Sequence, residues 1–437
     1  MSDVDKRARD RRRARTALEH AMWDLEAALV LSAPAHDAEA KVAAALARVD
    51  DDGDRAHFAE RRRALDHALQ NGGARGPALQ AYARVYGVGG ARAWTSSSGV
   101  RFFRVVTESF PRHINYVYVA DIGGEIVLWD CGSGLGRARR MILDGFALLR
   151  CFDFVVTPAD IDVILVSHGH YDHFGDAKWW KEATQAPLWI HELDARVIEN
   201  FQERTVITGR DIAVWLASAG CPDDDVRELV SMYLASKEIY SSVPVDRRLR
   251  HHQELFSGRA RLIHTPGHCP GHVCMRVDDV MLVADQVLAP ITPHLSPQAL
   301  HPNNGLDRYL TGLGRLMRED GVATVLPAHY DDIPDLHQRI REIAEDHVGK
   351  LKRVREVCAS GATVVDVAKE LFGNQEGYNV LLAILEAGTH VEYLHQLGAL
   401  VVSDLDALVS NPRLPFRYQA TDVVHDAARF AVELGGG

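Results

Sequence analysis

Four short groups of histidine and aspartate residues stand in the middle of the chain, each after an apolar run that predicts a β-strand. The groups lie at 168–173, 264–268, 285 and 329. Imidazole and carboxylate side chains are ligands that zinc prefers in proteins. Because side chains that follow several strands can meet at one edge of a sheet, the four groups together predict a metal site.

The first group has the pattern H-x-H-x-D-H. In extended backbone, residues i and i+2 point the same way, so His168 and His170 can hold one metal ion from one side. Asp172 and His173 follow where the chain is expected to turn into a helix, so they can face a second ion. Two cations need a shared anion, and the carboxylate of Asp285 is placed to bridge them. Two divalent ions about 3.5–4 Å apart would lower the pKa of a bridging water and produce a hydroxide nucleophile.

These residues resemble the metallo-β-lactamase superfamily over about residues 100–340. The family's D-x-G turn stands here as Asp130 to Gly132, its T-P-G-H stretch begins at Thr265, and its P-x-H ends at His329. Two positions depart from the usual pattern, with Cys269 where Thr is common and Ala284 where Gly is usual.

The resemblance implies a set of ligands for each of two metal ions. One ion is expected on three histidines, namely His168, His170 and His268. The other is expected on Asp172, His173 and His329, with Asp285 bridging the two. The implied cofactor is two Zn²⁺, with Fe or Mn as alternatives, and the implied catalytic residues are Asp172 and Asp285.

The implied fold is α/β, an αββα sandwich with its site at the sheet edges. Residues 1–95 are expected to be an N-terminal helical extension, since Leu18, Met22, Leu25 and Leu29 mark one helix face. Residues 96–340 are the expected metallo-β-lactamase-fold catalytic domain, preceded by a Gly- and Ser-rich linker near 87–99. Residues 341–437 are expected to form a winged-helix-like domain, because helical stretches there precede a hairpin start. Residues 194–240 predict helices that cover the site as a lid or side wall.

Composition excludes several broad classes. The chain has 437 residues, of which 47% are hydrophobic and 25% charged, as in ordinary soluble globular proteins. A net charge of −11 predicts no general attraction to nucleic acid or to anionic membranes. No signal peptide and no membrane span are expected, because no apolar run approaches about 18 residues. The six cysteines contain no C-x-x-C pair, so a reducing, cytoplasmic location is expected.

The leading functional prediction is hydrolysis of a small-molecule acyl thioester such as an acyl-CoA, or of a related ester, by the metal-bridging hydroxide. A lactonase is an alternative that uses the same site. A single-strand endoribonuclease of the β-lactamase-like protein 2 type is another, suggested by the winged-helix resemblance and by the basic run Lys6 to Arg15. The complete ligand set argues against an iron-dependent persulfide dioxygenase and against a non-catalytic regulator.

The charge of the C-terminal part argues against a nucleic-acid partner. Residues 345–437 contain eight Lys or Arg against thirteen Asp or Glu, whereas a domain that reads DNA or RNA should be basic. This part is therefore expected to shape the substrate entrance or to form a homodimer interface.

Other polar residues near the four groups have ordinary structural roles as their first interpretation. His264 and His272 are expected to brace their loop through hydrogen bonds. Tyr171 is expected to pack or to face solvent, with donation to a substrate oxygen as the alternative. His191 is a candidate for support behind the ligands, and Cys269 is expected to point away from the metal.

Overall fold

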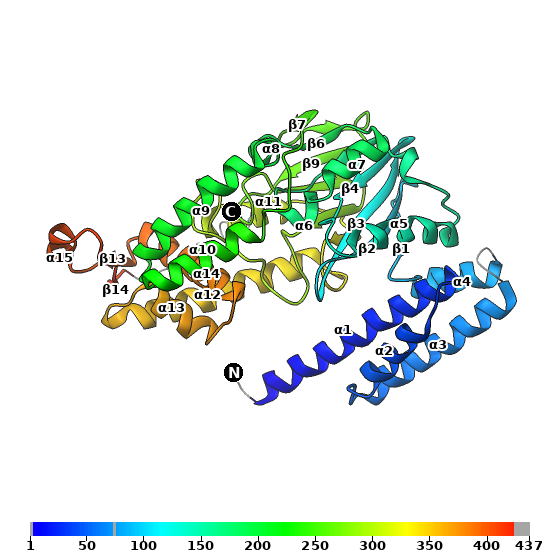
Figure 1. Ribbon diagram of the computed structural model, residues 1–437, viewed down its shortest axis with the longest axis horizontal. Coiled ribbons are helices and arrows are strands. Elements are labelled where there is room, and N and C mark those ends of the chain that lie inside the picture. Colours follow the sequence, from blue (N-terminus) through cyan, green and yellow to red (C-terminus); the bar gives the residue numbers. More distant parts are fainter. Residues whose placement is uncertain (1–2, 73–75, 424–437) are drawn as a thin grey trace. The chain divides into compact units, whose positions relative to one another are not determined.

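Helices and strands alternate along most of the chain, which is the mixed α/β organisation predicted from the sequence (Figure 1). The structure is a computed structural model that describes residues 3–72 and 76–423. Its chain divides into two compact units, one of residues 1–164 with 182–186 and one of residues 165–181 with 187–437. Within the described residues no helix is long and apolar enough to cross a membrane. The predicted domain boundaries at residues 95 and 340 stay predictions.

The first unit begins with helices, as the apolar periodicity predicts. They are α1 (Asp3–Val30), α2 (His36–Leu46), α3 (Asp52–Gly72) and α4 (Pro77–Tyr86). Leu18, Met22 and Leu25 of α1 are fully buried and pack in one cluster with Phe58 of α3. The helix α4 was not predicted, because its ten residues lie within a stretch bounded by glycines.

A buried charged group joins three of these helices. Arg61 of α3 donates to the Glu26 carboxylate of α1 at 2.7 Å and to Glu19 at 2.6 Å. Tyr82 of α4 donates its hydroxyl to the same Glu26 at 2.5 Å. Because an unpaired buried charge is costly, these contacts specify how α1, α3 and α4 pack.

Four antiparallel strands complete most of the first unit. They are β1 (Arg92–Thr95), β2 (Arg101–Phe110), β3 (His113–Ile122) and β4 (Glu125–Trp129). Strands β3 and β4 form a hairpin in which Ile122 is paired to Glu125 across a two-glycine turn. The predicted linker at 87–99 is wrong in part, because β1 within it pairs with β2. After β4 come α5 (Ala138–Leu148), η2 (Leu149–Phe152) and η3 (Pro158–Asp160).

A five-stranded sheet forms the centre of the second unit, in the order β12-β11-β10-β9-β8. Its strands are β8 (Glu254–Leu255), β9 (Ala260–His264), β10 (Val273–Val277), β11 (Val280–Ala284) and β12 (Thr324–Pro327). Strands β9 and β11 both run antiparallel to β10, and β12 runs parallel to β11. The carboxyl ends of β9, β11 and β12 therefore lie at the same edge of this sheet.

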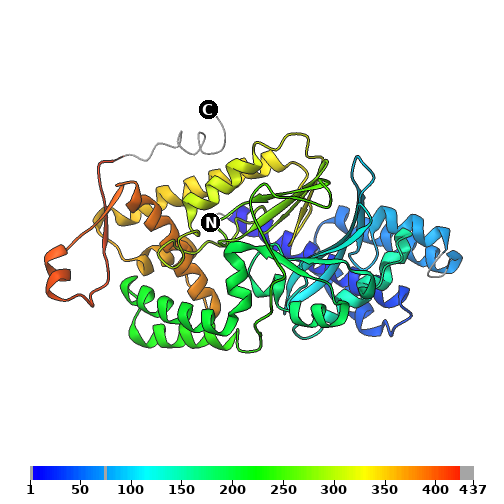
Figure 2. The ribbon, with the colours of Figure 1, turned by 90° about the horizontal axis from the view of Figure 1, so that it is seen from above.

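Other elements precede or interrupt the strands of this sheet along the chain. They are β5 (Val163–Leu165), α6 (Tyr171–Phe174), α7 (Ala177–Thr184), β6 (Leu188–His191), α8 (Glu192–Glu199), α9 (Phe201–Ser218), α10 (Asp223–Ala235), β7 (Arg247–Leu249) and α11 (Leu306–Leu316). Among them, β5, β6 and β7 belong to a seven-stranded sheet with β1 to β4. The helices predicted within residues 194–240 are confirmed as α8, α9 and α10. Helix α10 packs against α9 and against the later helix α14 (Tyr378–Gln396), as Figure 2 shows.

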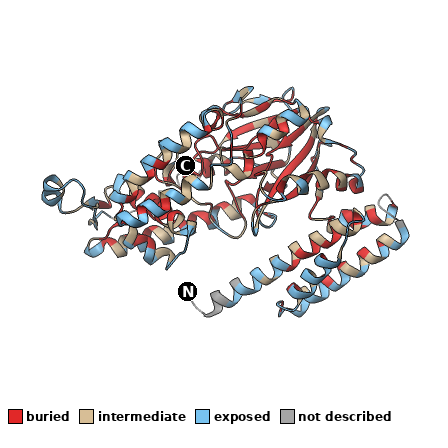
Figure 3. Ribbon diagram, in the orientation of Figure 1, coloured by how far each residue is buried: buried red, intermediate tan, exposed pale blue. Residues whose placement is uncertain are grey.

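The C-terminal helices agree closely with the sequence pattern. They are α12 (Leu336–Val357), η4 (Cys358–Ser360), α13 (Val364–Phe372) and α14, followed by β13 (Leu400–Val402), α15 (Leu405–Ser410) and β14 (Tyr418–Ala420). Thr363 caps α13 in a capping box with Asp366. Strands β13 and β14 pair antiparallel, and α15 between them buries no residue (Figure 3). The winged-helix assignment itself stays a prediction.

Candidate metal centre

Three of the predicted ligands follow strands whose carboxyl ends lie at one edge of the five-stranded sheet. The chain turns sharply after each of these strands. His268 follows β9, Asp285 follows β11 directly, and His329 follows β12. Strand β11 ends at Ala284, whose φ of +43° redirects the backbone and turns Asp285 out of the sheet. The H-x-H-x-D-H segment after β5 brings the remaining four side chains to the same place.

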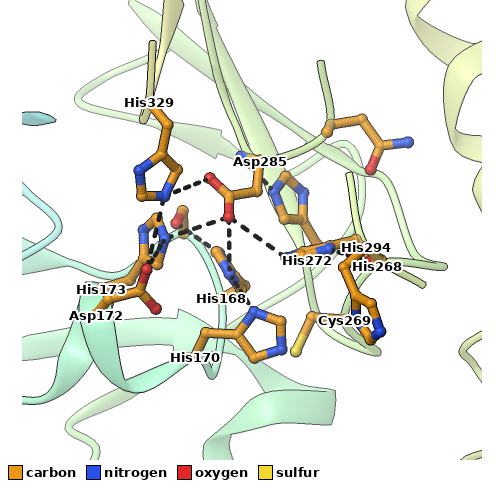
Figure 4. A network of polar contacts seen from close by, with 12 residues as sticks. His168, His170, Asp172, His173, His268, Cys269, His272, Asp285, His294 and His329 are labelled. Carbon is orange, nitrogen blue, oxygen red and sulfur yellow. Dashed lines mark hydrogen bonds and ion pairs between the residues drawn. The ribbon is translucent and has the colours of Figure 1, made fainter. Parts of the chain in front are cut away.

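Three histidines gather on one side of the Asp285 carboxylate (Figure 4). Nε2 of His168 lies 3.0 Å from Nδ1 of His170 and 3.9 Å from Oδ2 of Asp285. Nε2 of His268 lies 3.5 Å from the same Oδ2 atom. The ligand atoms of these four residues all lie within 4.8 Å of one another, which is the spacing of a metal-binding group.

A second group of donors shares Asp285 with the first. Nε2 of His329 lies 3.3 Å from Oδ1 of Asp285, and Nε2 of His173 lies 3.5 Å from Oδ2. Oδ2 of Asp172 lies 3.6 Å from the His329 nitrogen and 3.7 Å from that of His173. The structure thus brings all seven predicted ligands into one cluster, and metal binding by each of them stays a prediction.

Three side chains of the cluster favour the protonation states that metal binding requires, whereas the carboxylates of Asp285 and Asp172 outweigh burial and raise the pKa of His329. Burial lowers the pKa of His170 to about 3 and, with the neighbouring His173, holds that of His168 well below its usual range. Burial alone would raise the pKa of Asp285, but the surrounding imidazoles, His329 first, hold it well below its usual range. Neutral imidazole and ionised carboxylate are the forms that coordinate a divalent cation.

Hydrogen bonds behind the cluster orient the ligand atoms toward it. Nδ1 of His268 donates to the backbone carbonyl of His294 at 2.8 Å, so Nε2 carries the lone pair. That Nε2 atom is buried and has no hydrogen-bond partner among the described residues, while it faces Asp285. Nδ1 of His168 is hydrogen-bonded to the Ser167 hydroxyl at 3.0 Å. A buried imidazole lone pair aimed at a carboxylate fits a metal ion between them.

Asp194 supports two of the ligand loops and was missed by sequence analysis. Its carboxylate accepts the backbone N–H of Gly169 at 2.8 Å and that of Gly271 at 2.7 Å. It also accepts the Cys269 thiol at 3.2 Å. The residue lies inside α8, about 75 positions from the loop it holds, so no local pattern pointed to it.

His272 braces Asp285 from behind, in the structural role expected for it. Its Nε2 atom accepts the backbone N–H of Asp285 at 3.2 Å, and its Nδ1 donates to the Thr265 hydroxyl at 2.8 Å. The ring is fully buried, and burial holds its pKa well below the usual range. His272 therefore fixes the backbone at the point where β11 ends.

The remaining polar residues have supporting positions. His264 donates to the Pro270 carbonyl at 2.8 Å, the loop contact expected for it. His191 caps α8 through the N–H of Leu193 and stacks on His264 at 4.1 Å, so it supports the ligands only through that loop. The Cys269 thiol is directed to Asp194, which agrees with the expectation that it points away from the metal.

A family model described as the metallo-beta-lactamase superfamily matches residues 110–329, half of the chain, and this range contains every residue of the cluster. The chain belongs to the metallo-beta-lactamase superfamily. Proteins of this superfamily typically bind divalent metal ions, and the clustered His and Asp residues here fit that property. Family and cluster together indicate a metal-dependent hydrolase.

Two solved structures are similar to this chain in fold, and one curated protein is similar to it in sequence. A beta-lactamase domain protein from Burkholderia ambifaria aligns with 76% of this chain and 94% of its own, with a TM-score of 0.61 and 24% identity. A metallo-beta-lactamase family protein from Thermus thermophilus aligns with 73% of this chain and 98% of its own, with a TM-score of 0.58 and 23% identity. An uncharacterised protein of Mycobacterium leprae is 25% identical over 217 residues, which are 49% of this chain and 84% of that protein. The structural likenesses confirm the predicted fold.

Proposed function

We propose that this protein is a binuclear metal-dependent hydrolase that cleaves an acyl thioester, or a related ester, with water. The observation that carries the proposal is the shared position of Asp285. Its Oδ2 atom faces His268, while its Oδ1 atom faces His329. A site for a single ion would not require the second group of donor atoms, from Asp172, His173 and His329, that also faces this carboxylate. The all-imidazole and carboxylate donor set favours zinc, with iron or manganese as alternatives.

Each side chain has a definite role in this proposal. Three histidines would hold one ion and the group around His173 and His329 the other, with Asp285 between them. Divalent ions bound there would lower the pKa of a water molecule and polarise the substrate carbonyl oxygen. The Asp172 carboxylate lies against His329 and His173, so it can orient a water molecule and take up its proton.

The chemistry of the cluster supports a substrate with a good leaving group. The histidines of the cluster would bind metal ions as neutral rings, so they would have no proton to donate to a leaving group. A thiol has a pKa of about 8.5, so a thiolate can leave with little help from an acid. An alkoxide or amine leaving group would need a proton at that step.

The charge distribution supports a small-molecule substrate over RNA. Residues 345–437 carry thirteen acidic and eight basic side chains, a balance that repels a polyanion. A lactone would suit the same centre, and it differs from a thioester only in its leaving group.

The test is a hydrolysis screen of the metal-loaded full chain against acyl-CoA thioesters, acyl-glutathione, lactones and single-stranded RNA. We expect thioester hydrolysis that falls by about 100-fold or more in Asp172→Asn, because the proton acceptor is lost. The matched control is Asp211→Asn on the exposed surface of α9, which should retain full activity. RNA cleavage without thioester hydrolysis, or equal activity of Asp172→Asn and the wild type, would contradict the proposal.

A further inference from the structure

A lysine near the metal centre lies among three tyrosine rings. Nζ of Lys237, which follows the end of α10, lies 4.0 Å from the ring centre of Tyr233 and 4.7 Å from that of Tyr171. The ring of Tyr378, the first residue of α14, lies 5.9 Å away. Aromatic faces attract a cation at these distances, so rings from α6, α10 and α14 hold the ammonium group in place.

The tyrosine rings place this ammonium group beside the predicted ligands. Tyr171 stands in the H-x-H-x-D-H segment, between His170 and Asp172. The negative charge of Asp172 acts on Lys237 and favours its protonated form. Tyr171 is itself held by Tyr240, whose ring lies 5.2 Å away. Lys237 is therefore anchored on the Asp172 side of the cluster.

No carboxylate of the described residues forms an ion pair with Lys237. Among the described residues, the one hydrogen bond of its Nζ atom is a weak contact of 3.5 Å with the Ser236 hydroxyl. Lys181 and Lys350 of the same unit, by contrast, pair with Asp246 at 2.6 Å and with Asp346 at 3.0 Å. A half-buried ammonium group that lacks a carboxylate partner attracts an anion from outside the protein.

The tyrosines do not neutralise this charge. Burial raises the pKa of Tyr233 above the usual value, so this phenol stays uncharged at neutral pH. Burial also lowers the pKa of Lys237 to about 8, which leaves the amine mostly protonated near pH 7. The aromatic faces stabilise the cation in part but supply no hydrogen-bond acceptor as strong as a carboxylate or phosphate.

We propose that Lys237 forms an anion-binding subsite, and that the substrate carries a carboxylate or phosphate that binds this ammonium group while its acyl carbonyl reaches the metal centre. Tyr171, Tyr233 and Tyr378 are positioning residues for Lys237. The identity of the reacting acyl group rests on the proposed function, whereas the anion subsite can be tested without it.

The first experiment compares four thioesters that combine an anionic or neutral acyl group with an anionic or neutral leaving group: glutaryl and pentanoyl groups, each on CoA and on N-acetylcysteamine. The proteins are the metal-loaded wild type, Lys237→Met, Lys237→Arg and the exposed control Lys352→Met. Loss of a charge-assisted contact should lower kcat/KM of Lys237→Met at least about tenfold for the anionic substrates. The neutral pentanoyl N-acetylcysteamine thioester should change by less than about twofold, and Lys237→Arg should keep most activity.

The pattern of losses identifies the source of the anion. A loss confined to both CoA thioesters would assign Lys237 to the phosphates of the leaving group. A loss confined to both glutaryl thioesters would assign it to an acyl carboxylate. An equal loss on the neutral substrate, or no loss on any, would overturn the proposal.

A binding measurement separates this proposal from the proposed function. We would titrate pentanesulfonate, an anion that coordinates metals weakly, into the metal-loaded wild type and Lys237→Met. Binding at least about tenfold weaker in the variant would support the subsite even if no thioester were hydrolysed. Equal binding to the two proteins would overturn it.

Discussion

The carboxylate of Asp194 accepts the backbone N–H of Gly271 at 2.7 Å and thereby fixes the loop that carries the predicted ligand His268. The same carboxylate holds Gly169, which lies between two other predicted ligands. One buried side chain of α8 therefore sets the distance between two ligand loops that are far apart in the chain. We expect the metal centre to depend on this residue, which is not itself a predicted ligand.

Replacement of Asp194 by Asn tests this dependence. The amide keeps the shape but replaces one acceptor oxygen by an NH₂ group that faces a backbone N–H. We expect the free energy of unfolding to fall by about 1–3 kcal/mol and metal affinity to fall by about 10–100-fold. Urea unfolding and zinc titration would measure both. The control Glu192→Gln, whose side chain pairs with Arg250 at the surface, should change stability by less than about 1 kcal/mol. Unchanged metal affinity in Asp194→Asn would contradict this role.

Two glycines provide a matched test of the same packing. A Cβ atom at Gly271 would lie 2.7 Å from Cγ of Asp194 and 2.8 Å from its backbone nitrogen, so Gly271→Ala must displace one of the two loops. A Cβ atom at Gly349 in α12 would meet nothing within 4 Å. We expect Gly271→Ala to lower both melting temperature and metal content, while Gly349→Ala should stabilise the protein by about 0.5–1 kcal/mol. Similar melting temperatures for the two variants would argue against the close contact.

Glu386 of α14 makes stability depend on pH. Its carboxylate accepts the N–H of Leu295 at 2.7 Å and lies 3.4 Å from Lys350. The bond to Leu295 holds the segment in which the neighbouring His294 carbonyl accepts the hydrogen bond of His268. Burial alone would raise the pKa of Glu386, but Lys350 and the nearby His390 hold it below the usual 4.5. The folded protein thus favours the ionised form, so this stabilisation is complete above pH 4.5 and is lost as pH falls through the lowered pKa.

The comparison of wild type with Glu386→Gln checks this prediction. At pH 7 the variant should be less stable by about 1.5–3 kcal/mol, because a charged hydrogen-bond acceptor is lost. The difference in the free energy of urea unfolding between wild type and Glu386→Gln should become smaller once pH falls below the usual pKa of glutamate. Glu356→Gln on the exposed side of α12 is the control and should change stability at pH 7 by less than about 1 kcal/mol. A difference that stays constant across the range would refute the electrostatic explanation.

Arg61 is expected to be essential for the N-terminal helices. Arg61→Met would leave the fully buried Glu26 carboxylate without its main counter-charge. We expect the first unit to lose about 3–5 kcal/mol of stability, with a much smaller effect of Arg63→Met on the exposed side of α3. Fluorescence of Trp23, which packs against this region, would follow unfolding. Equal stability of the two variants would show that the ion network contributes little.

The ligand cluster could be predicted from sequence because its signals are local. His168 and His170 stand two residues apart, and Asp285 and His329 each follow an apolar strand directly. The helical stretches predicted for the C-terminal part also rest on local sequence, and they correspond to α12, α13 and α14.

Features that depend on long-range contacts could not be predicted. Lys237 meets Tyr171 and Tyr378 from distant parts of the chain, and nothing near Asp194 in sequence indicates its two glycine partners. Strand β1 was missed because only four residues pair, and their partners lie in β2. Sequence patterns show which residues could do chemistry, whereas the supporting contacts depend on tertiary packing.

The most direct test of the central claim is the metal content of purified wild type and Asp285→Asn. The shared carboxylate predicts about two zinc ions per chain in the wild type and loss of at least one of them in the variant. Asp211→Asn, the same change on the exposed surface of α9, would serve as a control with wild-type metal content. A wild type that holds a single ion, or an Asp285→Asn variant that keeps its full metal content, would contradict the account.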